Sequence, residues 1–183
     1  SYVDNVLTTN TRDKAIVVGG KTYDTMAKAI EAVGYGQTIY VLKDIPDAVG
    51  IAVPSNKNFT IDFGGHTYTL IGPGAGSSGT ETNGFQLLRD STITFKNGTI
   101  RIAEGANNIK RIIQNYADLT LEDMHIYAEN QVPDENYALS FNNGDITFKG
   151  DTDVITTSDD VIAFDICKFS NYPSASVTFD ESY

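Results

Sequence analysis

The sequence predicts an all-β fold in which the chain winds as a parallel β-helix, with three short strands in each coil. The first observation is a four-residue phrase (apolar, Thr, apolar, charged) that begins at residues 59, 93, 119, 146 and 177, at spacings of 34, 26, 27 and 31. Repeats of about 20–50 residues are typical of solenoids, where each unit buries its apolar face on its neighbours. The second observation is that a whole three-strand unit repeats in phase with this phrase.

The N-terminal part precedes these repeats. We expect a tether leading into a strand over residues 1–20, and a β-helix domain over residues 21–183 that opens with a helix over 24–33. Apolar residues recur there at the spacing of one helix face: Met26, Ala29, Ile30 and Val33. Asp24 or Thr25 can cap the start of this helix and Gly34 can end it. Placed before the first coil, the helix would cover unpaired strand edges.

Two further strands are expected before the repeats, at residues 38–42 and 50–53, separated by a turn over Asp44–Asp47. Within each repeat the Thr phrase is the first strand, the second follows a short turn, and the third follows a longer loop. The second strands are 67–70, 99–102, 125–128 and 154–156, and the third are 85–88, 111–114, 138–141 and 162–166.

Side chains should alternate between the interior and the surface along each strand. The threonines would then form an outward-facing ladder: Thr60, Thr94, Thr120, Thr147 and Thr178. Gly, Asn or Asp at the corners supplies the left-handed backbone conformation that a tight bend requires. An antiparallel sandwich or jelly roll remains the rival fold, but in-phase repetition of the three-strand unit favours the β-helix.

Composition argues against several classes of function. The formal net charge of −11 disfavours nucleic acid and anionic lipid as partners. The sequence contains no run of 18 apolar residues, so no membrane-spanning helix is predicted. Cys167 is the single cysteine, so no intrachain disulfide can form. We expect it to be a small buried hydrophobic residue. The chain begins at Ser1 rather than Met, so we expect that its true N-terminus has been removed. It stops one strand into a new coil: either this strand pairs as the last rung or the native protein continues with further coils or domains, and we favour continuation.

Three segments, residues 23–30, 36–45 and 59–67, carry a resemblance to a known family. Together they resemble the pectate-lyase-like right-handed β-helix superfamily, and more narrowly repeat modules of bacterial secreted or surface proteins. The resemblance covers roughly residues 20–180. It implies a right-handed coil and a secreted or cell-surface location, with a glycan or a host surface protein as partner. It implies no single activity, because the superfamily contains lyases, hydrolases, adhesins and phage fibres.

The clearest enzymatic hint is the pair Asp159 and Asp160. The segment 158–163 is similar to a phrase of polygalacturonases, in which paired aspartates perform inverting hydrolysis. This chain has Ser158 and Val161 where that phrase has Gly and Cys, and no Gly-His-Gly follows. The competing interpretation is a polar corner before an inward-facing strand.

Other candidates concern binding. Asp151 and Asp153 are candidate Ca²⁺ ligands, although the segment lacks the Gly and Glu of an EF-hand loop, so no cofactor is assigned. His125 could approach a carboxylate on the next coil. Three tyrosines are candidate sugar-stacking residues: Tyr68, Tyr127 and Tyr137. The loops 72–84, 103–109 and 129–136 are expected to form the recognition surface.

These observations favour a non-catalytic module that contacts glycans or other cell surfaces, or serves as a structural stalk. One alternative is a polysaccharide hydrolase or lyase that uses Asp159 and Asp160. Another is a phage-fibre-like β-helix, which would form a trimer. An enzyme would need at least two carboxylates paired on neighbouring coils, whereas an adhesion module would not.

Overall fold

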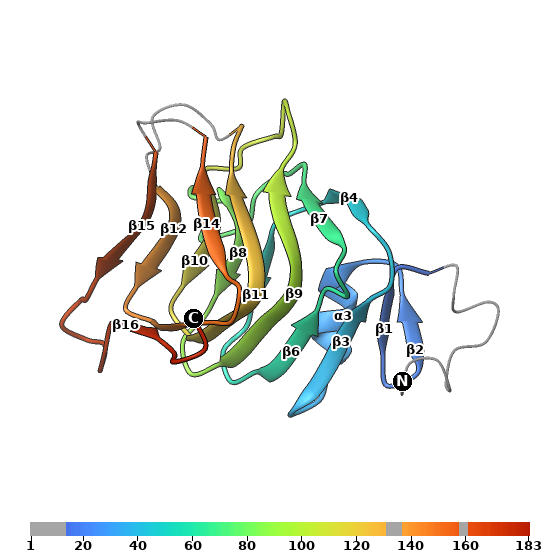
Figure 1. Cartoon of the computed structure of the whole chain (residues 1–183), viewed down its shortest axis with the longest axis horizontal. Coiled ribbons are helices and arrows are strands. Elements are labelled where there is room, and N and C mark those ends of the chain that lie inside the picture. The colour runs from blue at the N-terminus through green and yellow to red at the C-terminus, as the bar shows by residue number, and fades with distance from the viewer. Residues whose placement is uncertain (1–13, 131–136, 158–160) are drawn as a thin grey trace.

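The computed structural model describes residues 14–130, 137–157 and 161–183 and shows an all-β chain with mainly parallel sheets (Figure 1). The larger sheet has eleven strands: β1 (Ile16–Val18), β2 (Lys21–Tyr23), β3 (Gln37–Val41), β4 (Ile45–Ala48), β6 (Asn58–Asp62), β7 (Thr67–Leu70), β9 (Thr92–Ile102), β11 (Asp118–Ala128), β13 (Asp145–Lys149), β14 (Asp153–Thr156) and β16 (Ser176–Phe179). The smaller has five: β5 (Ile51–Val53), β8 (Asn83–Leu87), β10 (Arg111–Asn115), β12 (Tyr137–Asn142) and β15 (Ile162–Cys167). Only the pairs that β1 makes with β2 and β3 are antiparallel among the described strands.

The expected helix is present as α3 (Met26–Ala32), within the predicted range of 24–33. Its N-cap is Thr25, whose hydroxyl oxygen accepts a hydrogen bond from the Lys28 amide at 3.2 Å. At the other end, the Lys57 ammonium donates to the Ile30 carbonyl at 3.0 Å, so a cation meets the helix C-terminus. The helix packs against β1 and β2 at the N-terminal end of the larger sheet (Figure 1).

The predicted threonine ladder is confirmed by the strand register. Thr60, Thr94, Thr120, Thr147 and Thr178 pair in sequence across β6, β9, β11, β13 and β16. The ladder also extends to Thr38 on β3, which the five-phrase pattern did not include. On β9 the residues on either side of Thr94 are Ile93 and Phe95, both fully buried. The alternation therefore directs the apolar residues inward and the threonines outward.

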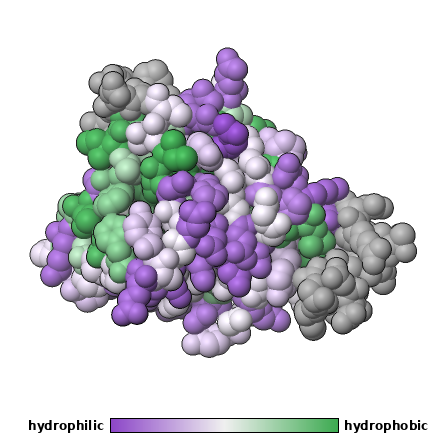
Figure 2. All heavy atoms as spheres, in the orientation of Figure 1, coloured by the Kyte–Doolittle hydropathy of each residue, from purple (hydrophilic) through white to green (hydrophobic). Residues whose placement is uncertain are grey.

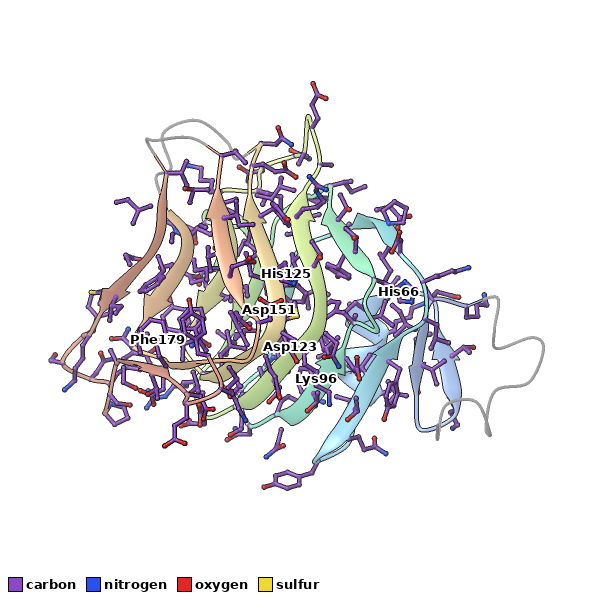
Figure 3. The ribbon with its side chains drawn as sticks, viewed as in Figure 1. His66, Lys96, Asp123, His125, Asp151 and Phe179 are labelled. Atoms are coloured by element: carbon purple, nitrogen blue, oxygen red, sulfur yellow. The ribbon has the colours of Figure 1, made fainter. Side chains whose placement is uncertain are left out.

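A second ladder on the outer face alternates in charge. Asp62, Lys96, Glu122 and Lys149 are in register on adjacent strands, and Figure 3 shows the position of Lys96 on this face. Opposite charges on neighbouring strands stabilise a sheet by about 0.2–1 kcal/mol per pair. A register shifted by one residue would lose these opposite-charge pairs, so the alternating charges favour the observed register.

The corners differ from the sequence expectation in one respect. β9 and β11 each continue through the corner that we expected to separate two strands. The bend is made by one residue with positive φ, Asn97 (60°) or Asp123 (52°), and Gly150 (60°) is the equivalent after β13. A single left-handed residue redirects the strand while pairing resumes on the far side.

A second correction concerns the segment 44–47, which we expected to be a turn. It contributes β4, which pairs in parallel with β7 through an irregular register. Ile45 and Ala48 are buried, whereas Pro46 and Asp47 are exposed. Proline is tolerated on an edge strand, because its missing N–H group faces no partner.

The two sheets share one aromatic core. Phe63 lies 5.7 Å from both Tyr68 and Phe95, measured between ring centroids, in edge-to-face contacts. Phe85 of the smaller sheet lies 4.9 Å from Phe95 and 5.5 Å from Tyr68 of the larger sheet. Aromatic pairs in this range of distances are worth about 0.5–1.5 kcal/mol beyond their burial. The core therefore ties β7, β8 and β9 together across the two sheets.

The two ends of the stack of strands are unlike. The N-terminal end is covered by α3 and by the antiparallel pair β1–β2. At the C-terminal end several large hydrophobic side chains are exposed: Ile162, Ile166, Phe169 and Phe179. Figure 2 shows hydrophobic surface over these last strands. Phe179 stacks on Phe148 of the neighbouring strand β13, at 5.3 Å between centroids.

Candidate functional site

A cleft of about 350 Å³ lies at the corner where strands of the smaller sheet lead into the larger sheet. We call it the corner cleft and define it by seven lining residues: Arg89, Asp90, Tyr116, Asp118, Asn143, Asp145 and Tyr172. The chain passes this corner after β8, after β10 and after β12, and the loop between β15 and β16 adds Tyr172.

The backbone stacks these corners directly on one another. The Tyr116 amide donates to the Leu87 carbonyl at 2.8 Å, and the Asp145 amide donates to the Ala117 carbonyl at 2.9 Å. Each corner follows a strand that pairs in parallel with the equivalent strand of the next repeat. Residues that are far apart in the sequence therefore meet in one cleft, and the same pairing that builds the sheets also builds the site.

Two carboxylates lie side by side on neighbouring strands of the cleft. Asp118 begins β11 and Asp145 begins β13, and the two residues are paired in register. The hydroxyls of Ser174 and Ser176 donate to the two carboxylate oxygens of Asp145, at 2.9 and 2.7 Å. Burial raises the pKa of Asp118 above its ordinary value, and the charge of Asp145 raises this pKa further. Two carboxylates from successive repeats are thus paired on neighbouring strands.

The cleft also contains two aromatic rings and one cation. The rings of Tyr116 and Tyr172 lie 6.1 Å apart between centroids, with an angle of 31° between their planes. The Arg89 guanidinium carbon lies 4.7 Å from the centroid of Tyr172, a cation–π distance. Arg89 Nε also lies 3.5 Å from a carboxylate oxygen of Asp90. The positive charge is thus already matched within the protein.

Asn143 contributes a buried polar group without a partner. The residue is 3% exposed and has a φ of 67°. Its side-chain oxygen accepts a hydrogen bond from the Phe169 amide, whereas its Nδ2 is buried and makes no hydrogen bond. Buried side-chain donors are normally satisfied in folded proteins. Asn143 also lines the corner cleft, so this unpaired donor belongs to a residue of the cleft wall.

The predicted metal candidates, Asp151 and Asp153, do not line the corner cleft. Asp159 and Asp160 lie outside the described residues. Asp151 is exposed, and its amide donates to Asp123 at 2.8 Å (Figure 3). Among the described residues no group of three or more His, Cys, Asp or Glu side chains is arranged to hold a metal ion.

The prediction that His125 approaches a carboxylate of the next coil is confirmed. His125 Nδ1 lies 2.8 Å from Asp153 Oδ1, and the two residues pair in register between β11 and β14. Figure 3 shows His66 well apart from His125, toward the N-terminal strands. Its Nδ1 lies 3.5 Å from Asp44 Oδ1. Each histidine therefore has one carboxylate neighbour.

The predicted sugar-stacking tyrosines have three different settings. Tyr68 is 1% exposed and packs in the core, so its ring is not available to a ligand. Its burial, together with the charge of Asp47, raises the pKa of its hydroxyl. Tyr127 is partly covered by Arg101, whose guanidinium carbon lies 5.3 Å from the ring centroid. The side chain of Tyr137 lies outside the described residues.

Sequence reasoning treated the corner residues only as polar turns. The available signal was an aspartate directly before two successive Thr phrases, at Asp118 and Asp145. In a solenoid, equal positions in successive phrases predict adjacent side chains. Tyr172 and Arg89 carried no such signal, because the loop that holds Tyr172 belongs to no repeat.

No protein-family model, no curated protein and no solved structure matches the chain. Among the described residues no helix has the length and apolar character needed to cross a membrane.

Proposed function

We propose that this chain is a right-handed parallel β-helix module of a secreted or surface-attached bacterial protein, and that it contacts glycans through the corner cleft. The fold part of the proposal is supported by the in-register pairing of equivalent strands in successive repeats. The functional part rests on the cleft, which combines two tyrosine rings, two carboxylates and an unsatisfied amide donor.

Glycans suit this combination for a physical reason. A sugar ring presents an apolar C–H face and a rim of hydroxyl groups. Tyrosine offers an apolar ring surface, while carboxylate oxygens accept, and amide N–H groups donate, hydrogen bonds to hydroxyls. Binding sites commonly pair an apolar lining with a few placed polar groups. Asn143 Nδ2 is the group that gains most from a ligand, since it is buried without a partner.

A second candidate function is hydrolysis of a polysaccharide at the same cleft. One observation favours it: the pKa of Asp118 is raised while the carboxylate of Asp145 lies next to it in register. Glycosidases use a carboxylic acid that keeps its proton beside a carboxylate that does not. This candidate replaces the predicted pair Asp159 and Asp160 with a pair whose position the structure describes.

The test is a glycan array probed with the wild-type chain and with Tyr172→Ala, followed by product analysis for each bound polysaccharide. Tyr35→Ala is the matched control, because Tyr35 is 86% exposed and lines no part of the cleft. We expect glycan binding that is lost in Tyr172→Ala and kept in Tyr35→Ala. Product release that disappears in Asp118→Asn would favour the hydrolase. Binding that Tyr172→Ala leaves intact would refute the assignment of the cleft.

A further inference from the structure

We propose that the corner cleft selects glycans that carry a protonated amine, such as chains of glucosamine, over their N-acetylated or uronic acid counterparts. This inference rests on the proposed glycan contact and adds the chemical class of the ligand. The observation behind it is that Asp118 and Asp145 have no basic partner in the cleft, while the one cation there, Arg89, already contacts Asp90.

The charges of the cleft do not balance. Arg89 is engaged by the Asp90 carboxylate and by the ring of Tyr172. No salt bridge joins Asp118 or Asp145 to a basic side chain among the described residues. The partners of Asp145 are two neutral hydroxyls, of Ser174 and Ser176. Two adjacent acidic groups therefore face the cleft without a cation of the protein between them.

A ligand ammonium group would relieve this imbalance. Charge-assisted hydrogen bonds from an ammonium to a carboxylate are roughly twice as strong as neutral ones. The raised pKa of Asp118 is consistent with this reasoning, because part of that shift comes from the charge of Asp145. A uronic acid would instead bring a further negative charge to a chain that carries −11 overall. An N-acetyl group would replace the cation with a neutral amide.

The remaining groups favour a sugar over a simple amine. Asn143 Nδ2 needs an acceptor oxygen, which a sugar hydroxyl supplies and a lysine side chain does not. Tyr116 and Tyr172 line the cleft next to the carboxylates, where the C–H face of a sugar ring can pack. The cation, the acceptor and the apolar face occur together in one unit of an amino sugar.

The experiment compares three tetrasaccharides of one length by titration calorimetry on the intact chain: glucosamine, N-acetylglucosamine and galacturonic acid units. The pH is set so that the sugar amine is protonated and carboxylates are ionised. Loss of one charge-assisted contact predicts at least about tenfold weaker binding. We expect the glucosamine chain to bind at least about tenfold more tightly than the other two, and Asp118→Asn to remove this preference.

The matched control is Asp151→Asn, which makes the same change of charge at the opposite end of β13 from Asp145. It should leave the preference unchanged. Asp145→Asn is a second variant in the cleft, and circular dichroism checks that each variant is folded.

Equal or tighter binding of the N-acetylated chain would overturn the inference and leave the proposed glycan contact standing. Absence of binding to all three sugars and to the wider array would overturn both. Binding of an oligolysine peptide as tight as that of the glucosamine chain, and unaffected by Tyr172→Ala, would replace the glycan with a basic peptide.

Discussion

Replacing Phe95 by alanine should cost much of the stability of the chain. Phe95 is fully buried on β9 and contacts the rings of Phe63 and Phe85 at 5.7 and 4.9 Å. Truncating a core Phe to Ala costs about 3–5 kcal/mol, and the two ring contacts favour the upper half of that range. The change would remove a large part of a total stability of about 5–15 kcal/mol. With a urea m-value near 2 kcal/mol/M, the midpoint should fall by roughly 2 M.

The assay is urea unfolding followed by circular dichroism, with Thr94→Ala as the matched variant one residue away. Thr94 lies on the outer face in the threonine ladder, so its truncation should cost less than about 1 kcal/mol. Similar losses for the two variants would show that β9 does not alternate between core and surface as described. A loss below about 1 kcal/mol for Phe95→Ala would refute the magnitude.

Three further outcomes are expected. Gly98→Ala should destabilise the chain by about 1–3 kcal/mol in the same assay, because a methyl group there would clash with Phe63; a neutral effect would contradict the corner geometry. Asn115→Ala should cost about 2–4 kcal/mol, measured by the thermal midpoint, because the Asn115 side chain bonds the Ala117 amide and the carbonyls of Ala117 and Asp145, at 3.0–3.1 Å; a cost no larger than that of Asn107→Ala, at an exposed position, would count against those bonds. Asp118→Asn should raise stability at neutral pH. Burial and the charge of Asp145 hold the pKa of Asp118 in the folded state above its ordinary value, so the folded state keeps this proton to higher pH than the unfolded chain does and loses stability as pH rises between the two pKa values. The stability gained by Asp118→Asn over the wild type should therefore grow from acid to neutral pH and then stay constant. A stability gain that is largest in acid would contradict the raised pKa of Asp118.

The opposite effects expected for Asp118→Asn on stability and on binding follow from one cause. Two neighbouring carboxylates repel each other in the empty cleft, and a ligand cation converts that repulsion into attraction. Binding residues often lower the stability of the free protein in this way. An Asp118→Asn variant that is more stable and binds less tightly would therefore support both halves of the argument.

The strand order was predictable because one local pattern repeats along the chain. The Thr phrases alone predict the register of five strands, and the structure pairs each Thr with the next. The helix was predictable from the spacing of its apolar residues and from the cap at Thr25. Such features depend on residues that are close in sequence, or on residues at the same position of successive repeats. Both can be recognised in a single sequence.

Features that depend on geometry between unlike segments were not predictable. The continuation of β9 through its corner depends on the φ of Asn97, and sequence alone does not distinguish such a bend from a break. β4 contains Pro46, which suggested a turn, although an edge strand accepts it. The cleft depends on Tyr172, which reaches it from a loop outside the repeats.

The most direct test of glycan contact at the corner cleft is a crystal structure of the chain with a bound glucosamine tetrasaccharide. The sugar amine should lie within hydrogen-bond distance of Asp118 and Asp145, with a ring against Tyr116 or Tyr172 and a hydroxyl accepting from Asn143 Nδ2. A sugar bound instead along the loops 72–84 or 103–109, with the corner cleft empty, would contradict the account.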